Sequence, residues 1–108
     1  MWRQQKKLPS FLPPVFKVKK KAVQVLKELS AYYFYPVTGG YGRSGVPDIV
    51  VCYKGLFVGI ECKAGNNKPT PLQEKNLDEI RAAGGTALVI NEDNVLRLSR
   101  TLFDLSSG

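Results

Sequence analysis

Two carboxylates and a lysine near the middle of the chain have the residue types and spacing of a hydrolytic metal site. Asp48 opens an apolar run over 48–53, and Glu61 and Lys63 close a second run over 57–63. If a two-residue turn at Lys54-Gly55 joins the runs as an antiparallel hairpin, opposed residue numbers sum to 109, and Asp48 lies opposite Glu61. Opposed side chains have Cβ atoms about 4.5–5.5 Å apart, where two carboxylates repel unless a cation lies between them. The spacing therefore predicts a site for a hard ion such as Mg²⁺ or Mn²⁺.

Lys63 follows Glu61 by two residues, so its side chain points to the same face of the strand. The alternative to a metal site is an exposed sheet face that carries a Glu-Lys pair. A slip of the hairpin by one residue would also send one carboxylate to the opposite face.

The chain has no histidine and two cysteines, which excludes several other kinds of site. A Ser-His-Asp or Cys-His nucleophile and a four-ligand Cys/His zinc site cannot be built from it. The hairpin register places Cys52 and Cys62 on the order of 16 Å apart, too far for a disulfide. We therefore predict two reduced thiols, buried in strands.

The positive charge of the chain is concentrated in its first quarter. Residues 1–27 contain eight cations and no acid, whereas residues 28–108 contain eight cations against nine acids. Such a block attracts polyanions, although it could also be a basic tail that keeps the chain soluble. Because no apolar run approaches the roughly 20 residues of a spanning helix, and no secretory signal is recognisable, a cytoplasmic location is predicted.

The elements that must position these residues follow from periodicity and turn signals. The prolines of segment 1–16 predict an extended N-terminal arm, and residues 17–108 form one domain. An apolar stripe from Val18 to Tyr33 predicts a first amphipathic helix beginning at Lys17, with a basic outer face. A glycine-rich loop over 36–45 leads to the hairpin.

A second helix is predicted from Thr70 to about Ala83, burying Leu72, Leu77 and Ile80. Thr70, Pro71 and Gln73 form a capping box with proline at the first helical position, and Gly84-Gly85 ends the helix. Two short strands, 86–90 and 95–98, complete an α-β-β-α-β-β order. The predicted fold class is α/β, a small mixed sheet flanked by helices.

Four segments, in order, resemble the PD-(D/E)XK nuclease superfamily and, within it, the VRR-NUC family. They are Gly45-Val46-Pro47-Asp48, Gly59-Ile60-Glu61-Cys62-Lys63, Thr70-Pro71-Leu72-Gln73 and Ala82-Ala83-Gly84-Gly85. The resemblance covers about residues 17–98 and implies a restriction-endonuclease-like fold.

The resemblance also implies roles for individual residues. Asp48 and Glu61 become metal-binding carboxylates, the backbone carbonyl of Cys62 becomes a further metal ligand, and Lys63 becomes the catalytic lysine. Gln73 matches an active-site glutamine, although capping explains it equally well. Related nucleases often have a glutamate early in the first helix, where this chain has Lys19-Lys20-Lys21. Glu28, the only acid on that helix, lies well away from the apolar stripe and is not predicted to take part.

The function that the resemblance implies is Mg²⁺-dependent cleavage of DNA, with Mn²⁺ as a substitute, by a structure-selective endonuclease. Branched DNA such as a Holliday junction is the expected substrate, and a homodimer is the expected assembly. The residues expected to contact DNA are Lys17, Lys19, Lys20, Lys21, Lys27, Arg43 and Ser44. The apolar residues Phe11, Leu12, Val15 and Phe16 are candidates for the dimer contact, unless the arm folds back over its own sheet.

Two other interpretations stay open. One is a non-catalytic basic DNA-binding domain with a degraded nuclease fold, and the other is a nuclease subunit of a larger complex.

Overall fold

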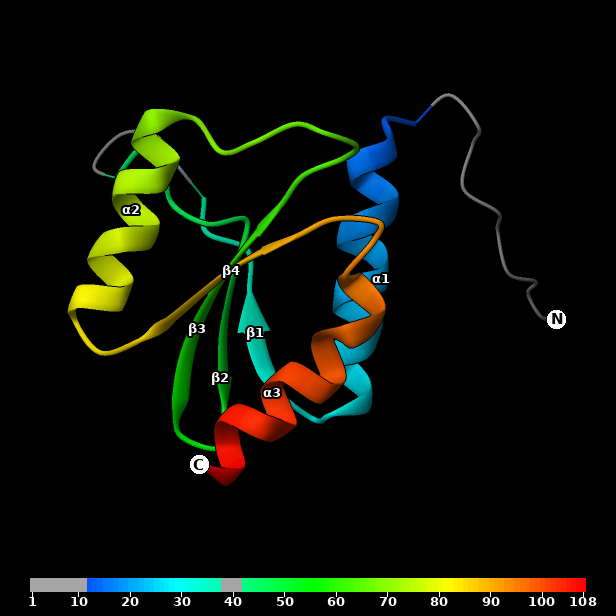
Figure 1. The fold of residues 1–108 in the computed structure, drawn as a ribbon, viewed down its shortest axis with the longest axis vertical. Helices are drawn as coiled ribbons and strands as arrows, with labels where there is room; N and C mark the ends of the chain where they lie inside the picture. The colour runs from blue at the N-terminus through cyan, green and yellow to red at the C-terminus, as the bar shows by residue number, and fades with distance from the viewer. Residues whose placement is uncertain (1–11, 38–41) are drawn as a thin grey trace, which may run out of the picture.

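A computed structural model describes residues 12–37 and 42–108 of the chain (Figure 1). A four-stranded sheet of order β1-β2-β3-β4 forms its centre. The strands are β1 (Tyr32–Phe34), β2 (Ile49–Tyr53), β3 (Leu56–Cys62) and β4 (Thr86–Ile90), and the helices are α1 (Pro14–Glu28), α2 (Pro71–Ala82) and α3 (Leu98–Ser107). Helix α2 lies on one side of the sheet, and α1 and α3 lie on the other (Figure 1). The α/β class expected from the sequence is confirmed.

The hairpin between β2 and β3 has the predicted register. Lys54 and Gly55 both have positive φ, 50° and 83°, as a type I′ turn requires. The pairs run from Tyr53 opposite Leu56 to Ile49 opposite Ile60, so each pair of residue numbers sums to 109. Strand β4 then pairs with β3 in parallel, which makes the sheet mixed.

Helix α1 begins at Pro14, three residues before its predicted start. Pro13 is extended, and proline is favourable at the first helical position because the N–H that it lacks would have no partner there. Val15 and Phe16 therefore belong to the helix and not to an arm. Leu12 and Pro13 precede the helix, and residues 1–11 of the predicted arm lie outside the described residues.

The end of α1 also differs from the prediction. The helix stops at Glu28, and Ser30 has a φ of 58°, which turns the chain out of the helical direction. Tyr33, predicted as the last residue of the helical stripe, instead lies in β1, which pairs with β2 at the edge of the sheet. Strand β1 was not predicted.

The predicted strand over 95–98 is wrong. Val95–Arg97 form a short 3₁₀ helix, η1, which continues into α3. Leu98 and Leu102, one helical turn apart, are fully buried, so packing of a helical face determines this segment. The observed order is α-β-β-β-α-β-α, with η1 before the last helix.

The main core lies between the sheet and the pair α1 and α3. Val18, Ala22 and Leu26 supply the buried face of α1. They pack in one cluster with alternate residues of β2 and β3, including Val51 and Val58. None of the helices described here is long and apolar enough to cross a membrane.

The opposite face of the sheet packs against α2. Leu77 is buried as predicted and Ile80 is half-buried, whereas Leu72 is 46 % exposed, contrary to the prediction. Gly59 on β3 allows the close approach, because a Cβ there would lie 2.7 Å from Ile80 Cδ1 and 2.9 Å from Pro47 Cγ.

Both cysteines are free, as predicted. Cys62 is buried, but Cys52 is exposed, which corrects its predicted burial. The side chain of Cys52 alternates onto the face of the sheet that the main core does not cover.

Candidate active site

A hollow of about 400 Å³ lies at the end of the β2–β3 hairpin that is remote from its turn. Its wall includes Asp48, just before β2, Glu61 on β3 and Lys63 just after it. Lys19 from α1 and Gln73 from the first turn of α2 also line the hollow. The structure therefore brings together the three charged groups that hairpin arithmetic predicted, and adds Lys19 beside Asp48.

Asp48 is held in place by the neighbouring strand. Its Oδ2 accepts a hydrogen bond from the backbone N–H of Cys62 at 2.8 Å. Its Oδ1 lies 3.6 Å from Nζ of Lys19. A carboxylate fixed at one oxygen by a backbone donor keeps the other oxygen in a defined direction, toward the hollow and the lysine.

Glu61 is 2 % exposed, and its two oxygens have different surroundings. Oε2 lies 3.5 Å from Nζ of Lys63, whereas Oε1 is buried without a hydrogen-bond partner among the described residues. Burial, helped by the charge of Asp48, raises the pKa of Glu61 from 4.5 to about 7, although Lys63 acts in the opposite direction. A buried carboxylate oxygen that lacks a donor is unfavourable unless a proton or a cation satisfies it.

These two carboxylates fit a hard divalent cation. Both residues line one small hollow, and oxygen is the ligand atom that Mg²⁺ prefers. Among the residues that the structure describes, no three His, Cys, Asp or Glu side chains cluster as metal ligands. An ion bound here would therefore take two protein carboxylates and complete its shell with backbone oxygen, water or substrate phosphate.

The thiol of Cys62 is not suited to be a ligand. It is buried in the core, and burial raises its pKa to about 12, so the thiol stays protonated at neutral pH. The backbone of Cys62 lines the site through the N–H that holds Asp48. Coordination by its backbone carbonyl stays a prediction.

Gln73 has the capping role that was the alternative to catalysis. Its Oε1 accepts the backbone N–H of Thr70 at 2.9 Å, and its own N–H donates to Thr70 Oγ1 at 3.2 Å. Because this capping box lies at the end of α2 beside the hollow, Gln73 also lines the site. Its catalytic role stays a prediction.

The predicted DNA contacts divide between two surfaces. Lys17, Lys20, Lys21 and Lys27 are exposed on α1, and Lys19 is half-buried between α1 and the acidic hollow. Lys19, Lys20 and Lys27 line a second hollow on the outer side of α1.

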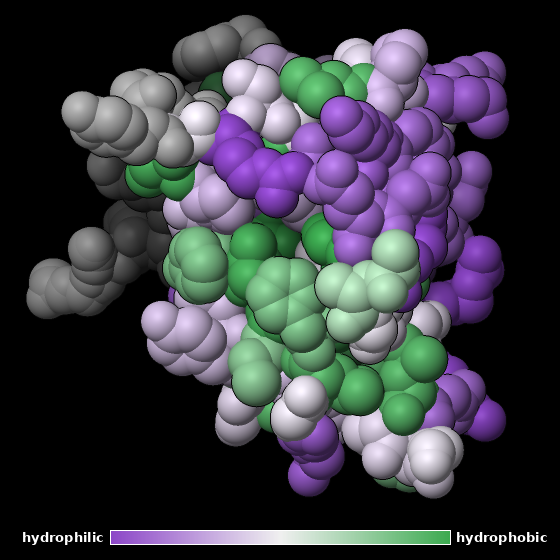
Figure 2. Space-filling model, turned by 90° about the vertical axis from the view of Figure 1, so that its left-hand side faces the viewer, coloured by the Kyte–Doolittle hydropathy of each residue, from purple (hydrophilic) through white to green (hydrophobic). Residues whose placement is uncertain are grey.

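Arg43 and Ser44 lie elsewhere. Arg43 forms an ion pair with Glu79 on α2, and the carbonyl of Ser44 accepts a hydrogen bond from the side-chain amide of Asn76 at 3.2 Å. Arg43 lines a further hollow with Phe34 and Phe57, and no residue of that hollow also lines the acidic site. Figure 2 shows the side of the molecule that carries α2, where hydrophobic side chains form one part of the surface and hydrophilic side chains another. The structure does not bring Arg43 and Ser44 to the candidate site.

Sequence reasoning missed some of the wall. Asn67 and Lys68, from the loop between β3 and α2, and Val15 from α1 also line the hollow. A loop without periodicity carries no signal for which of its residues face a site. Lys19 was expected only to contact DNA. Its approach to Asp48 could not be predicted, because that approach depends on how α1 packs against the sheet.

No family model matches the chain. Among curated proteins, it is 36 % identical over 55 residues to "Putative nuclease p44" of Acyrthosiphon pisum secondary endosymbiont phage 1. The match covers 50 % of this chain and 59 % of the phage protein, so this chain spans little more than half the length of that relative.

Among solved structures, the chain is similar to one described as "VRR_NUC domain", with a TM-score of 0.70 and 24 % identity. The similarity covers 82 % of this chain and 97 % of the other. This chain therefore has the fold of a VRR_NUC domain, as the sequence resemblance implied.

Proposed function

We propose that this chain, which has a VRR_NUC fold, is a nuclease that hydrolyses DNA phosphodiester bonds with a bound divalent metal ion. The observation that carries the proposal is that Oε1 of Glu61 is buried without a hydrogen-bond partner among the described residues, in a residue that lines the same hollow as Asp48. A cation would satisfy that oxygen and offset the repulsion between the two carboxylates. The name of the phage relative supports the same class of activity.

Asp48 and Glu61 would hold the ion, with the backbone carbonyl of Cys62 as a proposed further ligand. Bound Mg²⁺, or Mn²⁺ in its place, supplies a water of lowered pKa and polarises the scissile phosphate. The N–H of Cys62 orients Asp48, and Nζ of Lys63, 3.5 Å from Oε2 of Glu61, favours the ionised form of that carboxyl. Nζ of Lys63 would orient the attacking water or offset charge that develops on the phosphate. Gln73, at the rim, is a proposed contact for the water or the phosphate.

The proposed substrate is branched DNA, such as a Holliday junction. The lysines of α1 would contact phosphates, which positions DNA without reading its sequence. No described element has the form of a recognition helix in a helix-turn-helix, so selectivity would come from the shape of the DNA.

The proposed assembly is a two-fold homodimer, because a junction needs two cuts and residues 12–37 and 42–108 of each chain form one candidate site. Sedimentation at micromolar concentration should show a dimer. A monomer that still resolves junctions by paired cuts would contradict this proposal. A dimer that survives deletion of residues 1–11 would remove those residues from the contact.

Cleavage of labelled junction, flap, duplex and single-stranded DNA tests the nuclease proposal. We expect cutting in Mg²⁺ or Mn²⁺ and none in EDTA. Asp48→Asn, Glu61→Gln and Lys63→Ala should each lower the cleavage rate at least about 100-fold, since each removes an ion ligand or the charge beside the phosphate. DNA affinity, measured without divalent ions, should change little.

Asp104→Asn is the control, because Asp104 is an exposed carboxylate of α3 that pairs with Arg100 away from the site. It should cut like the unmodified chain. Full cleavage in EDTA, or in any two of the three site variants, would contradict the assignment. DNA binding without cleavage under every condition would favour the non-catalytic interpretation.

A further inference from the structure

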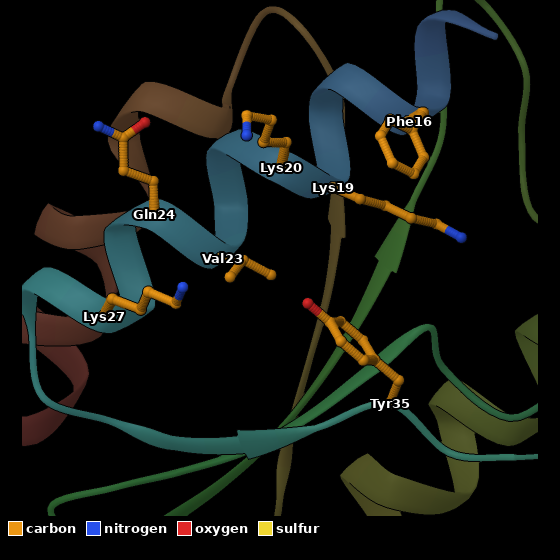
Figure 3. A pocket seen from close by; sticks show the side chains of 7 residues that line it. All are labelled: Phe16, Lys19, Lys20, Val23, Gln24, Lys27 and Tyr35. Atoms are coloured by element: carbon orange, nitrogen blue, oxygen red, sulfur yellow. The ribbon is translucent and has the colours of Figure 1, made fainter. Parts of the chain in front are cut away.

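A second hollow, of about 700 Å³, lies between the outer side of α1 and the chain just after β1. Phe16, Val23 and three lysines come from α1, and Tyr35 comes from the opposite wall with its hydroxyl toward the helix (Figure 3). We call this hollow the α1 groove. The function proposed above uses its lysines but not its aromatic residues.

The α1 groove exposes two aromatic rings. Phe16 is 43 % exposed and Tyr35 is 55 % exposed. The ring of Tyr35 stands edge-on to that of Tyr33, with centroids 6.1 Å apart, and Tyr33 packs against the core. Tyr35 is therefore supported on one side and open on the other, as a ring that stacks on a ligand must be.

The charge of the α1 groove has one sign. Lys19, Lys20 and Lys27 line it, and no carboxylate does. Within residues 12–37 and 42–108, neither Lys20 nor Lys27 forms an ion pair, so their charge is available to an anionic ligand. Lysines that alternate with open aromatic rings are the combination that binds single-stranded nucleic acid, whose phosphates and base faces are both accessible. Duplex DNA offers the phosphates but keeps its base faces stacked inside.

Lys19 connects the α1 groove to the candidate active site. It lines both hollows, and its Nζ lies 3.6 Å from Asp48 Oδ1. A DNA strand bound in the α1 groove would therefore lie beside Lys19, next to the two carboxylates.

We infer that the α1 groove binds an unpaired segment of DNA next to the bond to be cut, with bases stacked on Phe16 and Tyr35 and phosphates held by the lysines. The inference rests on the proposed nuclease function and specifies its substrate. Among branched DNAs, the chain would then prefer those in which a single-stranded segment adjoins the cleavage point, such as a flap, to a fully paired junction.

Binding of two DNAs by the full chain in EDTA tests this inference by fluorescence anisotropy. One is a blunt duplex, and the other is the same duplex with a short single-stranded tail that carries 2-aminopurine. We expect tighter binding of the tailed DNA and a fall in 2-aminopurine fluorescence as the base stacks. Tyr35→Leu and Phe16→Leu should each lower affinity for the tailed DNA about 5- to 100-fold more than for the blunt one, and Tyr35→Leu should abolish the fluorescence change.

Tyr32→Leu is the matched control, because Tyr32 is a 70 % exposed aromatic of β1 that does not line the α1 groove. It should keep the preference for the tail. Equal losses on both DNAs, or no loss with Tyr35→Leu, would overturn the inference. Because Tyr35 is exposed, its leucine variant should fold even if Phe16→Leu does not.

Other occupants of the α1 groove give distinct results. A change from dimer to monomer in Tyr35→Leu, seen by sedimentation, would show that a second copy covers the groove. Tail binding only after residues 1–11 are deleted would show that the chain's own N-terminus fills it. Either result would overturn the inference. If the chain shows no preference for the tailed DNA but still cleaves the blunt duplex, this inference is overturned and the nuclease proposal stands. If the chain binds the tail but cleaves no DNA, the nuclease proposal is overturned and binding in the groove stands.

Discussion

Burial controls the charge of Glu61 in the folded chain. Its pKa is about 7 when folded, against an ordinary value of 4.5. Between these pH values the folded chain holds a proton at Glu61 that the unfolded chain has released. The free energy of unfolding therefore decreases as the pH rises through this window, because the folded state must then carry a buried charge.

The first residue-scale prediction concerns the metal-free chain. From about pH 5 to about pH 8, its free energy of unfolding in urea should fall by about 2 kcal/mol through this group. Glu61→Gln should remove that part of the fall, whereas Glu28→Gln, a change at an exposed acid of α1, should keep it. Mg²⁺ should raise stability more at the higher pH, since the ion competes with the proton. A pH dependence that is the same with and without Glu61 would contradict the assigned burial.

At the scale of single elements, the start of α2 joins a structural role to a place beside the site. The reciprocal hydrogen bonds between Thr70 and Gln73 satisfy two backbone N–H groups that the helix leaves unpaired. The same geometry fixes Gln73 at the rim of the acidic hollow. Stability and cleavage, measured on the same variants, separate the two roles.

Three variants of the cap make that separation. Thr70→Ala should cost about 1 kcal/mol of stability and leave cleavage by folded protein nearly unchanged. Gln73→Glu keeps a side chain that can complete the capping box, so stability should change by less than about 0.5 kcal/mol. Cleavage should nevertheless fall, because a negative charge then faces the phosphate. If Gln73→Ala and Gln73→Glu both cut normally, Gln73 is a cap and nothing more.

The elements that the sequence predicted correctly are those with local signals. The Lys54-Gly55 turn needs positive φ at two adjacent residues, and α2 has a cap, a proline and two glycines at its ends. By contrast, β1 has three residues and exists through pairing with Val50–Cys52, about twenty residues away. Residues 95–98 are too few to distinguish a strand from a helix, and packing of α3 against α1 decides the matter.

The candidate site also has parts that local sequence patterns predict and parts that they do not. Asp48 and Glu61 follow from the register of one hairpin, so arithmetic places them together. Lys19 reaches Asp48 because the first turns of α1 pack beside the end of the β2–β3 hairpin, which no local pattern encodes. The unpartnered Oε1 of Glu61, which carries the functional proposal, depends on burial by several elements at once.

At the scale of the whole molecule, α1 both packs against the core and forms part of the surface. Val18, Ala22 and Leu26 fill the core, while the other side of the helix exposes lysines around the α1 groove. Because residues 28–108 have a net charge of −1 (eight cations, nine acids), the excess positive charge that attracts a polyanion lies in this helix and the residues before it. DNA is therefore expected to approach the molecule from the α1 side, where Lys19 leads to the acidic hollow.

Salt dependence measures how many phosphates this side neutralises. For the duplex with a single-stranded tail, the logarithm of the binding constant should fall linearly with the logarithm of salt concentration, as condensed counterions are released. Lys20→Gln and Lys27→Gln should each make the slope shallower by about 0.7, the value for one phosphate contact on a single strand. Lys75→Gln is the matched control, because Lys75 is an exposed lysine of α2 that lines neither the α1 groove nor the acidic hollow. It should leave the slope unchanged. If Lys75→Gln changes the slope as much as Lys20→Gln does, DNA is attracted by net charge alone, and α1 is not the surface on which it lies.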